Sequence, residues 1–352
     1  MSIFRSQRNP IIKPKDVKPS SKDFEVIGVF NTGVARFEDD VILLLRVAER
    51  PISAHPDIVL AGVYDIAQGD IVLKEFSKND PENDFSDPRL IIRPAETYLT
   101  SISHLRLARS ADGINFDIED TPAIGPANDI ESFGVEDPRI TLIEGTYYVT
   151  YVAVSPLGVI TCLASTKDFK SFQRHGIIFC PENKDVVFFP ERIGGKYYAL
   201  HRPVSPLCKR QDIWIAESPD LRCWGNHRFL FAPVSDGWDQ IKVGASTAPF
   251  KIEQGWLEIY HGVDGGNRYC LGAVLLDADR PWKVIARAEK PIFEPQADYE
   301  TSGFYGNVIF TCGLLYEEDK LKIYYGAADT AICYAQLPVQ DVLGSLNLAD
   351  SA

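Results

Sequence analysis

Two adjacent carboxylates stand out in the motif FGVEDPRI, residues 133–140, where Glu136 and Asp137 precede a proline. A carboxyl group in a cleft can serve as a general acid when burial raises its pKa. Because proline disfavours a helical backbone at the residue before it, Asp137 is predicted to be extended and fixed in direction. Neighbours on a strand point to opposite faces, so only one of the two is expected to face a pocket.

A structural role for the same motif is the alternative. Arg139 lies two residues after Asp137, and on a continuing strand both side chains would share one face. The arginine could then form an ion pair with the carboxylate, which would be structural and would not act as a general acid. The motif by itself leaves both interpretations open.

Basic side chains fall at the ends of other strand-like runs and could hold an anion. They are Lys184 in NKDVVFFPE, Arg202 in LHRP, Lys242 in IKVGAST and His261 in IYHGV. Arginine offers a planar fork to a phosphate and lysine a point charge. The chain carries a formal net charge of −13, which disfavours nucleic acid and anionic membranes as partners. An anionic ligand would need such a local cluster, and the alternative is ordinary surface ion pairing.

The elements that must position these residues form a repeat. Five runs of β-forming residues begin beside turn residues: DVILLLRV, TYYVTYVA, KYYALHRP, WLEIYHGV and LKIYYGAA. A second pattern joins a strand end, an aspartate-bearing turn and an aromatic residue, with the aspartates at 112, 168, 220 and 279. A repeat of about 50–60 residues made of strands and turns is typical of a four-stranded propeller blade.

The fold class predicted from this repeat is all-β, a five-bladed β-propeller with an extended N-terminal arm. The first two runs lie further apart than the others, which predicts an insertion near residues 75–100. A pair of β-sandwiches is the alternative. No low-complexity linker divides the chain, so residues 23–345 are expected to form a single propeller domain. Residues 1–22 are expected to form the arm, because its prolines discourage regular strand pairing.

Equivalent positions of successive blades surround the central axis of a propeller. The sixth residues after the five turns are Arg46, Tyr151, His201, His261 and Gly326, with Arg202 and Asp329 nearby. Residues far apart in sequence are therefore predicted to converge on one pocket. The loop DYETSGFYGNV, residues 298–308, is predicted to lie on its rim, with Tyr305 as one candidate for stacking on a sugar.

Cysteine usage and the termini bear on the compartment. The seven cysteines form no C-x-x-C pair and no zinc-like cluster with histidine, so no metal site is predicted and buried free thiols are expected. The N-terminus has no apolar segment typical of a secretory signal. These features predict a cytoplasmic protein. The six cations of the first 22 residues suggest that the arm reaches an acidic neighbouring subunit, which is compatible with a homo-oligomer.

The chain resembles glycoside hydrolase family 130, the mannoside phosphorylases and related β-mannosidases. The resemblance rests on segments in a consistent order from about residue 24 to 340: GVEDPRI, FFPERIGGKYYALHRP, AESPDLRCWG, KVGA, GWLEIYHGV and IYYGAADT. It implies a five-bladed propeller, in agreement with the repeat. It also implies that Asp137 is the single catalytic acid, which reaches the glycosidic oxygen through the mannose 3-hydroxyl.

The same resemblance implies roles for the other polar residues. The implied phosphate ligands are Lys184, Arg202 and His261. The implied mannose-binding residues are Asn31, Arg46, Lys242 and Asp329. One stretch departs from the family pattern: KVGASTAPF places Ser246 and Thr247 where small or apolar residues are usual, and these two are expected to alter the acceptor subsite.

The implied activity is inverting phosphorolysis of β-mannosides, either β-1,2- or β-1,4-linked manno-oligosaccharides or mannosyl-N-acetylglucosamine, to α-mannose 1-phosphate. Inorganic phosphate is then a co-substrate, and no cofactor is expected. One alternative is a β-mannosidase, which should carry a carboxylate at position 261 to activate water. The other is a non-catalytic sugar-binding propeller. The linkage and the leaving sugar stay open at this stage.

Overall fold

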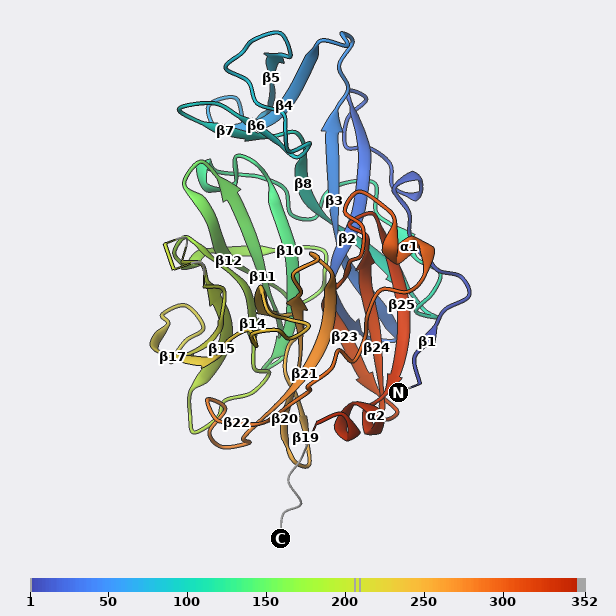
Figure 1. Cartoon of the computed structure of the whole chain (residues 1–352), viewed down its shortest axis with the longest axis vertical. Coiled ribbons are helices and arrows are strands. Elements are labelled where there is room, and N and C mark those ends of the chain that lie inside the picture. Colours follow the sequence, from blue (N-terminus) through green and yellow to red (C-terminus); the bar gives the residue numbers. More distant parts are fainter. Residues whose placement is uncertain (1, 206, 209, 347–352) are drawn as a thin grey trace.

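Five antiparallel β-sheets surround a central axis in the computed structural model, which describes residues 2–205, 207–208 and 210–346 (Figure 1). The fold is the predicted five-bladed β-propeller, and the alternative of paired β-sandwiches was wrong. In each blade the strand that comes first after the preceding blade lies innermost, and the following strands lie successively further out. The first strand of blade 1 contacts the first strands of blades 2 and 5, which closes the ring.

The blades are numbered here in chain order, each from its inner to its outer strand. Blade 1 consists of β2 (Phe24–Phe37), β3 (Asp40–Pro51), β8 (Ile102–Ser110) and β9 (Asp117–Ile118). Blade 2 consists of β10 (Val135–Ile143), β11 (Thr146–Ser155), β12 (Gly158–Thr166) and β13 (Gln173–Phe179). Blade 3 consists of β14 (Asn183–Phe188), β15 (Tyr197–Pro203), β16 (Ile213–Ser218) and β17 (Gly225–Phe231).

The last two blades depart slightly from this plan. Blade 4 consists of β18 (Lys242–Ala245), β20 (Gly255–Val263), β21 (Tyr269–Leu276) and β22 (Val284–Arg287), with β19 (Phe250–Ile252) also paired to β20. Blade 5 consists of β23 (Ile309–Glu317), β24 (Lys320–Ala327), β25 (Ala331–Pro338) and β1 (Phe4–Arg5). Its outer strand thus comes from the opposite end of the chain.

The five recurring runs of the sequence are the second strands of the blades, β3, β11, β15, β20 and β24. These strands are apolar on both faces because hydrophobic clusters fill the spaces between neighbouring blades. Leu43 of β3 packs with Tyr324 of β24 between blades 1 and 5, whereas Ile42, on the opposite face of β3, packs with Val149 of β11 between blades 1 and 2. A strand buried on both faces lacks an alternating polar pattern, which explains its continuous hydrophobic sequence.

The aspartate turns follow the third strand of a blade. Asp112, Asp168 and Asp220 each accept hydrogen bonds from backbone N–H groups two and three residues on. In blade 4 the prediction chose the wrong aspartate, since Asp277 rather than Asp279 accepts these bonds. The error arose because LLDADRPW contains two aspartates, Asp277 and Asp279, and either could begin the turn.

An insertion between β3 and β8, residues 52–101, contains the remaining strands: β4 (Ile58–Asp65), β5 (Asp70–Ser77), β6 (Leu90–Ile92) and β7 (Thr97–Leu99). They form two small two-stranded sheets with a core of their own that includes Phe76 and Tyr98. Figure 1 shows these strands together at one end of the long axis, beyond β2 and β3. The prediction of an insertion in blade 1 is confirmed, although the segment begins earlier than residue 75.

The N-terminal segment predicted as an arm lies along blade 5 of its own chain. Strand β1 pairs with β25, and Ile12 forms a further bridge with Ile332. The boundary at residue 22 and the contact of the arm with another subunit remain predictions.

The only regular helical turns in the described residues are short: η1 (Pro14–Asp16), η2 (Asp129–Glu131), α1 (Asp298–Thr301) and α2 (Val339–Gly344).

Arg5 ties this N-terminal strand to the propeller. Its guanidinium donates to both carboxylate oxygens of Glu300, which is fully buried. Substituting Arg5→Met should lower the free energy of unfolding by about 1.5–3 kcal/mol, because a buried carboxylate loses a charged partner. Urea denaturation measures the difference. Arg8→Met, at an exposed position of the same segment, is the control and should change the stability little.

The cysteines divide into two groups. Cys162, Cys270, Cys312 and Cys333 are buried free thiols, as predicted, whereas Cys180, Cys208 and Cys223 are exposed, which the prediction missed. Among the helices of the described residues, none is long and apolar enough to cross a bilayer.

Candidate active site

All eight residues predicted to form the site line a single cavity of about 300 Å³ at the axis. They come from every blade: Asn31 and Arg46 from blade 1, Asp137 from blade 2, Lys184 and Arg202 from blade 3, Lys242 and His261 from blade 4, and Asp329 from blade 5. The convergence predicted from the repeat therefore holds for these positions. Three of the five counted positions do not line it: Tyr151 donates to buried Glu131, His201 stacks on Phe179, and Gly326 lies against Asn31.

β-Bulges in the inner strands direct polar side chains toward the axis. Asn31, Asp137 and Asp185 have φ angles of 50°, 46° and 56°, and each lies where the register of its strand shifts. A bulge with one left-handed residue redirects a side chain that a regular strand would send to a sheet face. The same device is thus used in blades 1, 2 and 3.

This backbone corrects two predictions about FGVEDPRI. Asp137 is left-handed rather than extended, although a proline follows it. Because the bulge breaks the alternation of the strand, Glu136 and Asp137 both line the cavity. The alternation rule assumed a regular strand, and it fails where the strand is bulged.

The Asp137 carboxylate is buried and held from two sides. Asn31 Nδ2 donates to its Oδ1 at 3.0 Å, and Arg46 Nη1 donates to the same oxygen at 2.9 Å. Arg46 Nη2 also donates to Glu136 Oε1 at 2.7 Å. Burial alone would raise the pKa of Asp137, but Arg46, Arg139 and Lys184 outweigh it and hold the pKa below the usual value. In the ligand-free site the carboxyl is therefore ionised at neutral pH.

Arg139 does not neutralise the Asp137 carboxylate through the ion pair considered above. Its Nη2 donates to Asp185 Oδ1 at 3.0 Å, and its Nη1 donates to the backbone carbonyl of Asp137 at 3.2 Å. The bulge again explains the difference, since the two side chains no longer share a face. Arg139 supports the backbone that carries the acid.

A second group of charges occupies the blade 3 and blade 4 side of the cavity. Asp185 Oδ2 lies 2.8 Å from Arg202 Nη1 and 3.5 Å from His261 Nε2. Burial lowers the pKa of His261 well below its ordinary value, so the imidazole is neutral. The guanidinium, the imidazole and Lys184 give this side hydrogen-bond donors and positive charge, which together suit an anion.

Ser246 and Thr247 lie behind this group and do not line the cavity. Ser246 Oγ is 3.0 Å from His261 Nδ1, so the hydroxyl can fix the ring orientation and the protonated nitrogen. The expectation that these two residues shape the acceptor subsite was wrong. The expectation came from their departure from the family pattern beside the predicted pocket, but both side chains are buried in the fold.

Lys242 and Asp329 have perturbed pKa values. Burial and the neighbouring cations Arg202 and Lys184 lower the pKa of Lys242 to about 8, and its Nζ donates to the hydroxyl of Tyr269. Burial raises the pKa of Asp329 to about 6, with a further contribution from the nearby Asp137 charge. Asp329, with its raised pKa, therefore holds a proton more readily than Asp137, whose pKa is lowered.

The raised pKa of Asp329 predicts a stabilising substitution. A carboxyl that binds its proton more tightly in the folded state contributes stability below pH about 4, and this contribution is lost as the pH rises through about 6. Asp329→Asn should therefore raise the free energy of unfolding at pH 7 by about 1–3 kcal/mol. The gain should vanish at pH 4. Chemical denaturation at both pH values measures it, and an equal effect at both would contradict the assignment.

Several lining residues escaped the sequence analysis. Asp185 lines the cavity beside Lys184 although the sequence predicted no role for it, and Glu136, which was expected to face away, lines it too. Tyr269 and Phe310 also line the cavity, yet they sit in ordinary apolar strands and carry no signal in the sequence. Arg89, Leu90, Leu99 and Ser101 come from the insertion, whose position over the axis follows only from the fold.

Comparisons with known proteins agree with the fold. The family model described as β-1,4-mannooligosaccharide phosphorylase matches residues 88–348. A β-1,2-mannobiose phosphorylase of Listeria innocua is 48% identical over 99% of both chains. A solved structure of a β-1,2-mannobiose phosphorylase from Listeria innocua in complex with β-1,2-mannobiose is 48% identical and superposes with a TM-score of 0.95 over 98% of this chain and 99% of that chain. A 1,2-β-oligomannan phosphorylase of Thermoanaerobacter is 41% identical over 71% of this chain and 84% of its own.

Proposed function

The chain belongs to glycoside hydrolase family 130, and from this premise we propose that it cleaves β-1,2-mannobiose with phosphate to give mannose and α-mannose 1-phosphate. As a glycoside phosphorylase it acts on β-mannosides, in line with its relatives. One observation carries the proposal of phosphorolysis: the buried Asp137 and the donors Lys184, Arg202 and His261 line the same small cavity. The β-1,2 linkage is proposed from the relatives named above.

Phosphate is the nucleophile in this reaction. It is already anionic, so it requires no general base, only cations and donors that hold it opposite the leaving group. Lys184, Arg202 and His261 hold it. Phosphate oxygen attacks C1 of the mannose as the bond from C1 to the glycosidic oxygen breaks, and attack from the opposite side inverts the β-configuration. No metal or organic cofactor has a step in this scheme.

Asp137 supplies the proton that the leaving oxygen needs, directly or through the mannose 3-hydroxyl. The neighbouring cations keep this carboxyl ionised in the empty site. Bound phosphate offsets those cations, which raises the pKa of Asp137 and favours its protonated form. Asp137 is thus protonated and neutral when phosphate is bound. Transfer of this proton to the oxygen of the leaving mannose converts Asp137 back to the carboxylate.

The remaining residues hold the mannose that is transferred. Lys242 and Asp329 offer a donor and an acceptor to its hydroxyl groups. Asn31 and Arg46 were expected to bind this sugar, and their bonds to Asp137 support an additional role in positioning the acid. A hydrogen bond from a charged group to a sugar hydroxyl contributes about 1.5–3 kcal/mol, so each of these contacts affects affinity measurably.

Two alternatives are less well supported. A β-mannosidase would need a carboxylate near the anion side that is free to activate water, but Asp185 is ion-paired with Arg139 and Arg202, and position 261 is a neutral histidine. A sugar-binding scaffold would have no use for an acid facing an anion site. The proposed substrates are a manno-oligosaccharide and phosphate, not nucleic acid or a membrane, because the chain is strongly acidic.

We further propose a cytoplasmic location, since a charged sugar phosphate is retained by the cell that produces it. A homo-oligomer stays a prediction, which light scattering tests.

A substrate panel tests the proposed function. Purified protein is incubated with β-1,2-mannobiose, β-1,4-mannobiose and β-1,4-mannosyl-N-acetylglucosamine, each with and without phosphate. Turnover of the β-1,2-linked disaccharide only in the presence of phosphate is expected. Equal turnover without phosphate would overturn phosphorolysis, and a preference for a β-1,4-linked substrate would overturn the linkage.

A further inference from the structure

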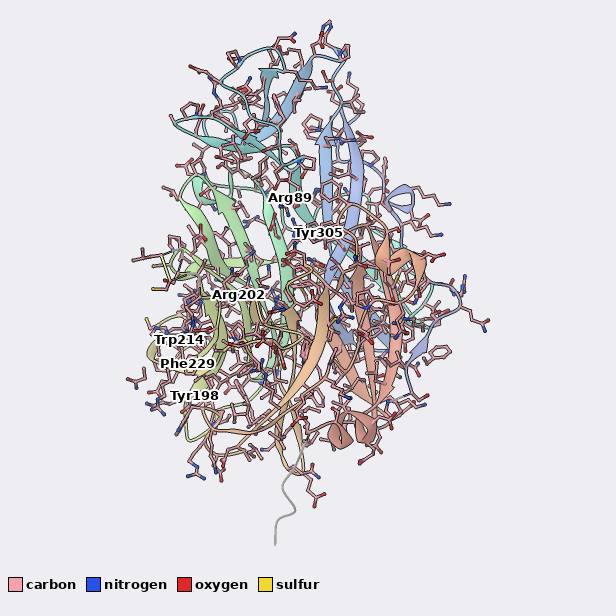
Figure 2. The ribbon with its side chains drawn as sticks, viewed as in Figure 1. Arg89, Tyr198, Arg202, Trp214, Phe229 and Tyr305 are labelled. Atoms are coloured by element: carbon pink, nitrogen blue, oxygen red, sulfur yellow. The ribbon has the colours of Figure 1, made fainter. Side chains whose placement is uncertain are left out.

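The mouth of the cavity is built by two segments that take no part in the proposed chemistry. One is the insertion, which contributes Arg89, Leu90 and Leu99. The other is the rim loop, residues 303–308, which contributes Phe304 and Val308. Figure 2 labels Arg89 and Tyr305 beside each other where the insertion meets the blades, and Arg202, which is buried, nearer the middle of the molecule. The prediction that residues 298–308 form a rim is consistent with this placement.

Arg89 is fixed in position although its side chain is half exposed. Its Nε and Nη2 donate to the two carboxylate oxygens of Asp87 at 2.9 and 2.7 Å. Its backbone carbonyl accepts from Thr100 N at 3.0 Å. Two of the three guanidinium nitrogens thus donate to Asp87, whereas Nη1 donates to no group of the described residues and is available to a ligand. An arginine held in this way loses little conformational entropy when it binds.

The guanidinium extends across the mouth. Its central carbon lies 5.6 Å from the centre of the Tyr305 ring on the opposite side, within cation–π distance. The hydrogen bond to Asp87 raises the pKa of Arg89, and the charge of Asp329 contributes. Arg89 is therefore close to the rim loop and lines the same cavity as Asp329.

The rim loop is fixed against the same turn that carries Asp329. Phe304 N donates to Thr330 Oγ1 at 2.9 Å, and Tyr305 N donates to the Ala328 carbonyl at 3.1 Å. A Cβ atom at Gly303 would lie 2.6 Å from Ala328, so only glycine allows this close approach. The Phe304 ring is 43% exposed and lines the cavity, so it presents an apolar surface to a ligand rather than to the core.

We propose that Arg89 and Phe304 form the subsite for the leaving mannose, and that the bridge from Arg89 to Tyr305 limits the substrate to two sugars. This inference rests on the proposed function. Arg89 Nη1 donates to a hydroxyl of the leaving sugar, and Phe304 stacks on its apolar face. The cavity of about 300 Å³ is at the lower end of the range for small-molecule sites, about 300–1,000 Å³, which suits a disaccharide better than a longer chain.

The variant Arg89→Ala tests this assignment, with Phe304→Ala as an independent second probe. Phosphorolysis of β-1,2-mannobiose and β-1,2-mannotriose is measured at saturating phosphate. In Arg89→Ala the KM for mannobiose should rise tenfold or more, the KM for phosphate should change less than twofold, and the kcat/KM ratio of triose to biose should increase. Phe304→Ala should also raise the KM for mannobiose.

Arg93→Ala is the matched control. Arg93 belongs to the same insertion and pairs with Glu82, but it does not line the cavity, so its removal should leave every constant unchanged. An unchanged KM and chain-length ratio in a folded Arg89→Ala variant would overturn the inference. A wild-type protein that forms no mannose 1-phosphate from either substrate would instead overturn the proposed function.

Discussion

Substitution of Asp137 by asparagine is expected to lower kcat for phosphorolysis by about 10²–10⁴-fold, the range typical of losing a general acid. An amide has nearly the same shape, and its oxygen can still accept from Asn31 and Arg46, but it carries no acidic proton. The KM for mannobiose should therefore change much less than kcat. Initial rates of mannose 1-phosphate formation at saturating phosphate measure the effect.

The chemistry of the leaving group provides the control for this prediction. A mannoside whose leaving group departs without protonation, such as a 2,4-dinitrophenolate, should be cleaved by Asp137→Asn at a rate much closer to that of the wild type. An equal loss with both substrates would assign Asp137 a structural role. Circular dichroism and the Tm establish that the variant is folded, which is expected because Arg46 retains Glu136 at 2.7 Å.

Substitution of Arg202 by methionine is expected to raise the KM for phosphate by about 10–100-fold, because a charged hydrogen bond to an anion contributes about 1.5–3 kcal/mol. Methionine fills a similar space but carries no charge. The buried Asp185 that Arg202 neutralises keeps Arg139 at 3.0 Å, so the fold should survive. The KM for mannobiose, measured at saturating phosphate, should stay within a fewfold of the wild type.

The double variant Arg202→Met with Asp185→Asn separates phosphate binding from charge burial. If the loss in the single variant came from a stranded Asp185 carboxylate, the second substitution would restore the KM for phosphate. We expect no restoration, because the cation itself binds the phosphate. A rise in the KM for mannobiose with no change in that for phosphate would place the anion elsewhere in the cavity.

The repeat in the sequence was enough to predict the fold. Turn residues before DVILLLRV and four similar runs marked the second strand of every blade, and a strand with two buried faces is a strong local signal. Counting from those turns also located Arg46 and His261 at the axis. The same counting misplaced Tyr151 and His201, because a shift of one residue moves a side chain to the other face of its sheet.

Backbone irregularities set the limit of this reasoning. The bulges at Asn31, Asp137 and Asp185 follow from tertiary closure around the axis, and the sequence near them is not distinctive. Proline after Asp137 even suggested the opposite backbone conformation. The residues that the sequence analysis left out, such as Asp185 and Arg89, gain their role only when separate blades or the insertion come together. Resemblance to a family supplied roles that no local pattern contained.

The site buries two carboxyl groups whose pKa values shift in opposite directions. Arg46 and Arg139 lower the pKa of Asp137 and keep it ionised, whereas burial raises the pKa of Asp329 and favours its protonated form. Such an arrangement is less stable than an apolar one of the same volume. The stabilisation expected for Asp329→Asn should therefore come with weaker binding of the sugar, as is usual for residues that serve function at the expense of stability.

The fate of the cleaved C1–O bond tests the phosphorolysis mechanism most directly. β-1,2-Mannobiose is incubated with the protein and phosphate in ¹⁸O-labelled water, and the products are followed by ³¹P and ¹³C NMR and by mass spectrometry. We predict that the mannose unit that supplies C1 appears first as α-mannose 1-phosphate and contains no ¹⁸O. Release of two free mannose molecules from each mannobiose, or a β-configured phosphate, would contradict direct attack by phosphate at this site.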